Sequence, residues 1–136
     1  MDRVFLDANV LFSAAYRVDN GLLRFWSLPG IPLLTSAYAI DEARRNLTDA
    51  NAVERLDRLL AEVEVVPESP ATTTLPAGVN LPAKDVPILL AAIVAQATHL
   101  LTGDVRHFGS LYGTTLGGVL ILPPAGYPIQ KPIPGE

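Results

Sequence analysis

The chain has 136 residues, so we expect one hydrophobic core and no second full domain. Hydrophobic residues make up 49% of the sequence and charged residues 18%, which excludes an intrinsically disordered chain. The net charge of −4 is unusual for a protein that binds nucleic acid, because affinity for phosphate normally comes from Lys and Arg. The sequence has no cysteine, which excludes disulfides and thiolate ligands, and no export signal is visible, so we expect a cytoplasmic protein.

The first part of the chain predicts a strand, two helices and a second strand. The apolar run 4–6 ends at Asp7, and the compact run 8–15 favours a helix, so Asp7 lies at the joint. A second helix is expected over 20–28, where large apolar side chains form one face and a Pro-Gly pair ends it. Residues 31–35 then predict a short buried strand.

The next stretch predicts two helices in succession. Ser36 is a good N-cap for a helix that runs to Leu47, with Glu42 on its polar side. Thr48 or Asp49 can cap a further helix. The apolar seam of this helix is expected to consist of Val53, Leu56, Leu60 and Val63.

The middle of the chain predicts a strand, a long loop and a buried helix. Residues 62–66 alternate like a half-exposed strand, and 67–82 are rich in Pro, Thr and Ser without any apolar period, which indicates a surface loop. The strongest helical pattern covers 86–97, where apolar and small residues occur on every side. We therefore expect a helix that is buried nearly all round and begins at Asp85.

The last elements complete an α/β pattern. Residues 99–102 predict a strand that ends close to Asp104, and 117–122 predict a final strand. Strands that alternate with helices favour a three-layer α/β/α sandwich with a mainly parallel central sheet. We expect this domain to span 1–122 and the Pro-rich C-terminal tail, 123–136, to be extended or disordered.

Three aspartates fall beside the carboxyl edge of the predicted sheet, where open α/β sheets bind ligands. Asp7 and Asp104 follow strands, and Asp85 reaches the edge from the start of a helix. Taken singly, each of these aspartates is best explained as a residue that caps a helix or forms a turn. Glu42 taken singly is best explained as a solvated residue on a helix. As a set, four crowded carboxylates repel one another unless a cation lies between them.

This set favours Mg²⁺ or Mn²⁺ over Zn²⁺, because the ligands are oxygens without Cys or clustered His. Without the four acids, the chain has ten acidic and ten basic residues. The net charge of −4 is therefore explained if these four acids form one acidic pocket. Phosphodiester hydrolysis, with one ion or two, is the chemistry that such a site favours.

Four segments resemble the motifs of the PIN-domain family, which includes the VapC-like toxin ribonucleases. The segments occur in family order over about 7–122, and they are 5–11, 41–47, 81–89 and 101–108. The resemblance implies a Mg²⁺- or Mn²⁺-dependent endoribonuclease that cleaves single-stranded RNA. It also implies a bacterial type II toxin with a cognate antitoxin protein, often as a homodimer.

By the same resemblance, the metal-binding and catalytic acids are Asp7, Glu42, Asp85 and Asp104. Asn9 and Thr102 are implied as polar neighbours that order these acids or their waters. Arg45 and Lys84 adjoin two of the acids, and they either contact RNA phosphate or balance local charge. For His107 an ordinary hydrogen bond in a turn is favoured over phosphate binding. A core position is favoured over base stacking for Tyr16, Phe25 and Trp26.

Two other functions stay open. An aspartyl-phosphate phosphatase also begins with a strand that ends in Asp, but such enzymes need a second Asp two residues later, where this chain has Asn9. The second alternative is a non-catalytic PIN-like module that binds RNA or protein.

Overall fold

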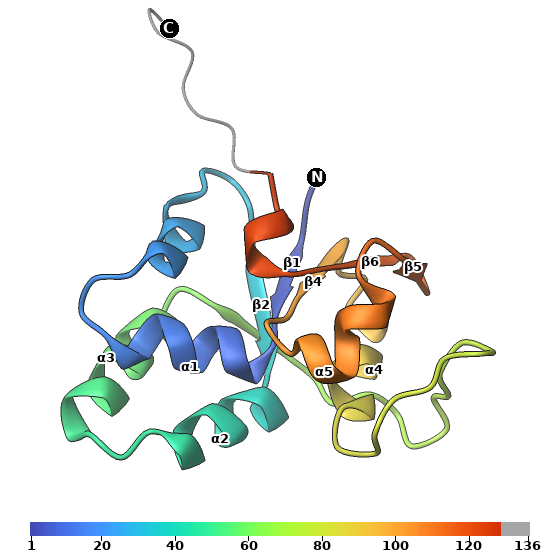
Figure 1. Ribbon diagram of the computed structural model, residues 1–136, viewed down its shortest axis with the longest axis horizontal. Coiled ribbons are helices and arrows are strands. Elements are labelled where there is room, and N and C mark those ends of the chain that lie inside the picture. The colour runs from blue at the N-terminus through green and yellow to red at the C-terminus, as the bar shows by residue number, and fades with distance from the viewer. Residues whose placement is uncertain (129–136) are drawn as a thin grey trace, which may run out of the picture.

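The computed structural model describes residues 1–128 and contains one six-stranded sheet in the order β3-β2-β1-β4-β6-β5 (Figure 1). All neighbouring strands are parallel except the last pair, in which β5 runs antiparallel to β6. The strands are β1 (Val4–Leu6), β2 (Leu33–Ser36), β3 (Glu64–Val66), β4 (His99–Leu101), β5 (Thr115–Leu116) and β6 (Val119–Leu122).

Helices cover both faces of this sheet. The α-helices are α1 (Ala8–Tyr16), α2 (Ala37–Asn46), α3 (Ala50–Leu60), α4 (Val86–Val94) and α5 (Val105–Phe108). Within the described residues they are accompanied by the 3₁₀ helices η1 (Gly21–Ser27), η2 (Gly109–Leu111) and η3 (Pro124–Gly126). Figure 1 shows α1, α2 and α3 grouped on the left and α4 and α5 on the right, and α1 packs against α2 and α3. The predicted three-layer α/β/α fold is confirmed.

The core lies on both sides of the central strands. Every residue of β1 is fully buried, as expected for a parallel strand with helices on both faces. Helix α4 is buried over Ile88–Ala92, as expected for a helix buried nearly all round, but its last turn departs from that prediction because Val94 is 41% exposed. The helix also ends before the predicted residue 97, because Gln96 adopts a left-handed backbone conformation with φ of 57°.

Two other elements differ from their predictions. The segment predicted as a helix over 20–28 forms the 3₁₀ helix η1, capped by the Asn20 side chain. The final strand starts at Val119 and not at residue 117, because Gly117 and Gly118 have positive φ values and form the turn of the β5–β6 hairpin. The predicted loop is confirmed, since no helix or strand occurs over 67–85 in the described chain. Among residues 1–128, no helix is long and apolar enough to cross a membrane.

The chain remains packed after Leu122, which differs from the extended tail expected from Pro123. Tyr127 is only 4% exposed, and its hydroxyl donates a hydrogen bond to Asp2. The Tyr127 ring packs edge-on against Phe25 and His99, with ring centroids 6.1 and 5.0 Å apart. Burial of this ring stabilises the ordered conformation of the segment that carries it. The rest of the predicted tail, 129–136, lies outside the described residues.

Candidate metal centre

One open cleft of about 490 Å³ contains all four of the acids that the sequence analysis selected. It lies at the carboxyl edge of the sheet, between α1 and α2 on one side and the starts of α4 and α5 on the other. Its lining consists of Asp7, Ala8, Asn9, Phe12, Glu42, Asn46, Lys84, Asp85 and Asp104. The cleft therefore presents four carboxylates and a single ammonium group.

Asp7 is the most constrained of these acids. It follows β1 and caps α1, where its Oδ1 accepts a hydrogen bond of 2.6 Å from the backbone N–H of Ala8. Its Oδ2 accepts hydrogen bonds from the Thr102 hydroxyl, at 2.8 Å, and from the Asn9 amide, at 3.2 Å. The residue is 3% exposed, so these contacts hold a buried carboxylate in one orientation.

The surroundings of Asp7 oppose its ionisation. Burial, the largest effect, raises the pKa of Asp7 from an ordinary value of 3.8 to about 6, and the nearby charges of Glu42 and Asp85 act in the same direction. The hydrogen bonds from Thr102 and from the Ala8 backbone oppose this rise in pKa without cancelling it. A cation in the cleft would favour the charged form of Asp7.

Asn9 and Thr102 join the two chain segments that carry Asp7 and Asp104. The Asn9 side chain accepts a hydrogen bond of 2.7 Å from the backbone N–H of Gly103 and lies 3.3 Å from the Thr102 hydroxyl. The same hydroxyl accepts a hydrogen bond of 3.1 Å from the backbone N–H of Asp104. These contacts suit the supporting role implied by the resemblance, and that role stays a prediction.

His107 completes a second group of side chains in the cleft region. Asp104 caps α5 by accepting a hydrogen bond from the His107 backbone N–H, at 3.1 Å. The His107 ring returns toward the acids, with Nδ1 2.8 Å from Oδ2 of Asp85 and 2.9 Å from Oδ2 of Asp104. Burial raises the pKa of Asp85, while the nearby His107 opposes the rise. The sequence analysis missed this arrangement, although the i,i+3 spacing of Asp104 and His107 is compatible with it.

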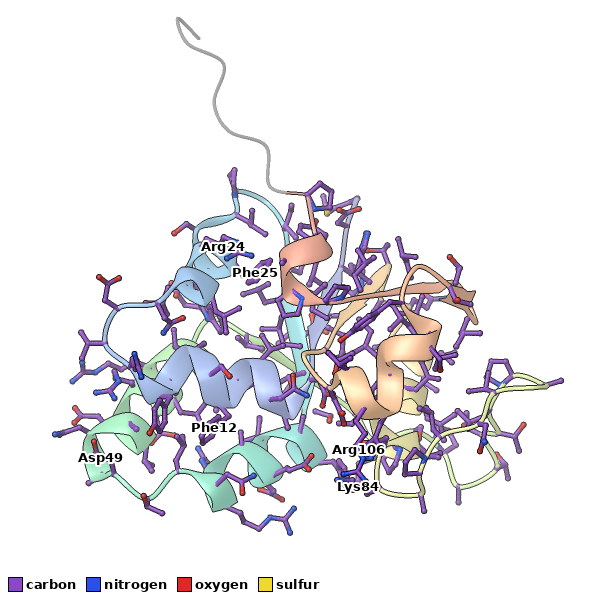
Figure 2. The ribbon with its side chains drawn as sticks, viewed as in Figure 1. Phe12, Arg24, Phe25, Asp49, Lys84 and Arg106 are labelled. Atoms are coloured by element: carbon purple, nitrogen blue, oxygen red, sulfur yellow. The ribbon has the colours of Figure 1, made fainter. Side chains whose placement is uncertain are left out.

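Cationic side chains occur at the border of the cleft. Lys84 lines the cleft, and its backbone carbonyl accepts a hydrogen bond of 2.6 Å from the Tyr38 hydroxyl. Arg106, in α5, is exposed, and Figure 2 shows it next to Lys84 in that view. Arg45 is exposed on α2 and is not among the residues that line the cleft. Of the two residues proposed from the sequence for RNA contact, Lys84 is thus the better placed.

The aromatic residues divide between core and surface. Phe25 is buried, and Trp26 is half-buried with its indole N–H donating to the Leu59 carbonyl at 3.0 Å. Tyr16 is 55% exposed, so its predicted core position is wrong. Its ring packs against Phe12, with centroids 5.3 Å apart, and Phe12 in turn lines the cleft.

The fold resembles solved structures of low sequence identity. A chain of VapBC2 from Rickettsia felis, solved bound to a DNA fragment from their promoter, matches with a TM-score of 0.63 and 15% identity, over 88% of this chain and 96% of that chain. A chain of FitAcB from Neisseria gonorrhoeae matches with a TM-score of 0.54 and 20% identity, over 91% of this chain and 99% of that one. The sequence matches no protein-family model and no curated protein. At these identities the likeness shows the fold.

Proposed function

We propose that the protein is a Mg²⁺- or Mn²⁺-dependent endoribonuclease that cleaves single-stranded RNA. The observation that carries the proposal is the convergence of Asp7, Glu42, Asp85 and Asp104 on one open cleft. These acids come from four separate segments of the chain. The resemblance to PIN-domain motifs supports RNA as the substrate.

The residues of the cleft fit a divalent metal ion. Burial raises the pKa values of Asp7 and Asp85, so their charged forms need a partner of opposite charge. Hard carboxylate oxygens are the ligands that Mg²⁺ and Mn²⁺ prefer, and the four acids would hold the ion. When bound, the ion supplies the activation of water and the charge neutralisation that phosphodiester hydrolysis requires. Asn9 and Thr102 hold the Asp7 carboxylate in one orientation through their hydrogen bonds to Oδ2.

The phosphates of an RNA substrate are repelled by an acidic cleft, so cationic side chains at its border are needed to offset this repulsion. Lys84 and Arg106 are both exposed and adjoin the segments that carry Asp85 and Asp104. We propose that they contact RNA phosphates, which repel the carboxylates unless a metal ion and these side chains offset the charge.

The biological setting is proposed on the same grounds. The fold likeness to VapBC2 and the resemblance to the VapC-like toxin ribonucleases support a bacterial type II toxin that pairs with a cognate antitoxin. We propose further that the protein acts in the cytoplasm as a homodimer. Co-purification with the product of a neighbouring gene tests the pairing, and sedimentation of the purified chain tests the dimer.

Cleavage of an end-labelled single-stranded RNA by the full chain tests the enzymatic proposal. Activity should require Mg²⁺ or Mn²⁺, stop with EDTA, and fall more than about 100-fold in Asp7→Asn and Asp104→Asn, beyond the loss typical for residues that only support a metal ligand. Asp41→Asn is the matched control, because Asp41 is exposed on α2 beside Glu42 and does not line the cleft. Undiminished cleavage in both site variants would contradict the proposal.

The two alternatives give different results. A phosphatase that forms an aspartyl phosphate would carry covalent phosphate on Asp7 after incubation with a phosphoryl donor. The position two residues later, where such enzymes need a second Asp, is Asn9. The Asn9 side chain is hydrogen-bonded to Asp7 and to the Gly103 backbone. A non-catalytic module would bind RNA without cleaving it, and calorimetry would detect no metal binding.

A further inference from the structure

His107 contacts two of the four acids, Asp85 and Asp104, and has no role in the proposed function. Its Nδ1 lies 2.8 Å from Oδ2 of Asp85 and 2.9 Å from Oδ2 of Asp104. One ligand atom from each of these three residues lies within 4.8 Å of the other two. The three side chains thus point their donor atoms at a common space.

These short contacts do not have the alignment of hydrogen bonds. Within residues 1–128, Oδ2 of Asp85 and Nδ1 of His107 are buried polar atoms without a hydrogen-bonding partner. Asp85 as a whole is only 6% exposed, so water has little access to it. A ring N–H lies in the plane of the imidazole, and at Nδ1 of His107 that direction is aligned with neither carboxylate oxygen. Buried polar atoms left unpaired are costly, and a bound ligand commonly explains them.

The spacings fit the coordination sphere of a metal ion. In octahedral geometry with ligands at about 2.1 Å, neighbouring ligand atoms lie about 3.0 Å apart. The two nitrogen–oxygen distances, 2.8 and 2.9 Å, are close to that separation. Imidazole nitrogen is a good ligand for first-row transition metals, whereas Mg²⁺ strongly prefers oxygen.

We infer that Asp85, Asp104 and His107 form a mixed nitrogen and oxygen site that takes a first-row transition-metal dication in preference to Mg²⁺. The inference deepens the proposed nuclease function and rests on it, because it names the class of cation that the cleft selects. His107 acts in this site as a direct ligand.

Pulsed electron paramagnetic resonance of Mn²⁺ bound to the full chain tests this assignment. A directly bound imidazole gives nitrogen modulation of the Mn²⁺ signal, and labelling the histidines with ¹⁵N changes that modulation without altering the protein. The chain has two histidines, and His99 is a matched control because its Nδ1 lies 2.8 Å from the Thr98 hydroxyl and its ring packs on Tyr127. The modulation should persist in His99→Asn and disappear in His107→Asn.

Competition between Mn²⁺ and Mg²⁺ for the site provides a second test. The preference for Mn²⁺ over Mg²⁺, measured from the signal of free Mn²⁺, should fall by about tenfold or more in His107→Asn. Bound Mn²⁺ without nitrogen modulation, or modulation that persists in His107→Asn, would overturn the inference and leave the proposed nuclease intact. A chain that binds no Mn²⁺ would overturn both.

Discussion

The Thr102 hydroxyl donates a hydrogen bond of 2.8 Å to Oδ2 of Asp7, although 95 positions separate the two residues in the sequence. The contact forms because β1 and β4 are parallel neighbours whose carboxyl ends meet, with the Asp7 backbone N–H donating to the Leu101 carbonyl at 3.1 Å. The orientation of the buried Asp7 carboxylate therefore depends on a residue from the other half of the chain.

Replacing Thr102 tests this positioning. Thr102→Val removes the hydroxyl that donates to Asp7 and accepts from the Asp104 backbone, so metal-dependent cleavage should fall about 10- to 100-fold. Thr102→Ser keeps the hydroxyl and should retain most of the activity. Steady-state cleavage assays of both variants measure the difference, and equal activity in the two would count against a positioning role.

Asp7 should make the stability of the metal-free protein depend on pH. Its pKa, about 6, lies above the ordinary value of 3.8, so its contribution to stability is fully present below about pH 3.8 and is lost as pH rises through 6. Asp7→Asn removes this titration. Between pH 4.5 and 7.5 in EDTA, the free energy of unfolding of Asp7→Asn should gain about 1–3 kcal/mol relative to the unchanged protein.

Urea unfolding of both proteins at the two pH values measures this change. Any pH-independent cost of the substitution, such as a lost hydrogen bond, cancels in the comparison. Asp41→Asn, at an exposed position, should show no such gain. A difference between Asp7→Asn and the unchanged protein that stays constant with pH would mean that Asp7 ionises normally.

Divalent metal should stabilise the folded chain. At a concentration of metal ion 100 times its dissociation constant, Mg²⁺ or Mn²⁺ should raise the free energy of unfolding by about 2.7 kcal/mol, because the unfolded chain has no assembled site. The melting temperature should rise with metal concentration and return on adding EDTA. Glu42→Gln should reduce the rise, and an identical rise in this variant would place the bound metal away from Glu42.

The segment after β6 should contribute to stability through Tyr127. Tyr127→Ala removes a buried ring that packs on Phe25 and His99, so it should lower the free energy of unfolding by about 3–5 kcal/mol. Tyr16→Ala is the matched control, because Tyr16 is exposed, and it should cost less than about 1 kcal/mol. Denaturant unfolding of the two variants should separate them, and equal losses would contradict the packed position of Tyr127.

The sequence could predict the features that depend on local patterns. Ser36 caps α2 as expected, with its hydroxyl accepting from the Ala39 backbone N–H at 3.2 Å. Asp7 and Asp104 follow strands, so the general rule for ligand sites in open α/β sheets predicted the edge on which they lie. Glu42 was expected on the polar side of its helix, and that side lines the cleft.

The features that the sequence could not predict depend on tertiary packing. His107 lies in α5, whose four residues are too few for a helical period, and its contact with Asp85 requires the start of α4 to lie near α5. Strand β5 has only two residues and exists through its pairing with β6. The burial of Tyr127 could not be predicted, because the Pro-rich composition of the segment around it indicated an extended chain.

Anomalous diffraction from crystals of the full chain grown with Mn²⁺ tests the central claim most directly, because it locates the bound metal without reference to activity. We expect a strong anomalous peak within the cleft, at coordination distance from carboxylate oxygens of the Asp7, Glu42, Asp85 and Asp104 group. The absence of an anomalous peak in the cleft at saturating Mn²⁺ would contradict a metal-dependent active site in this protein. Peaks found only elsewhere on the surface would contradict it as well.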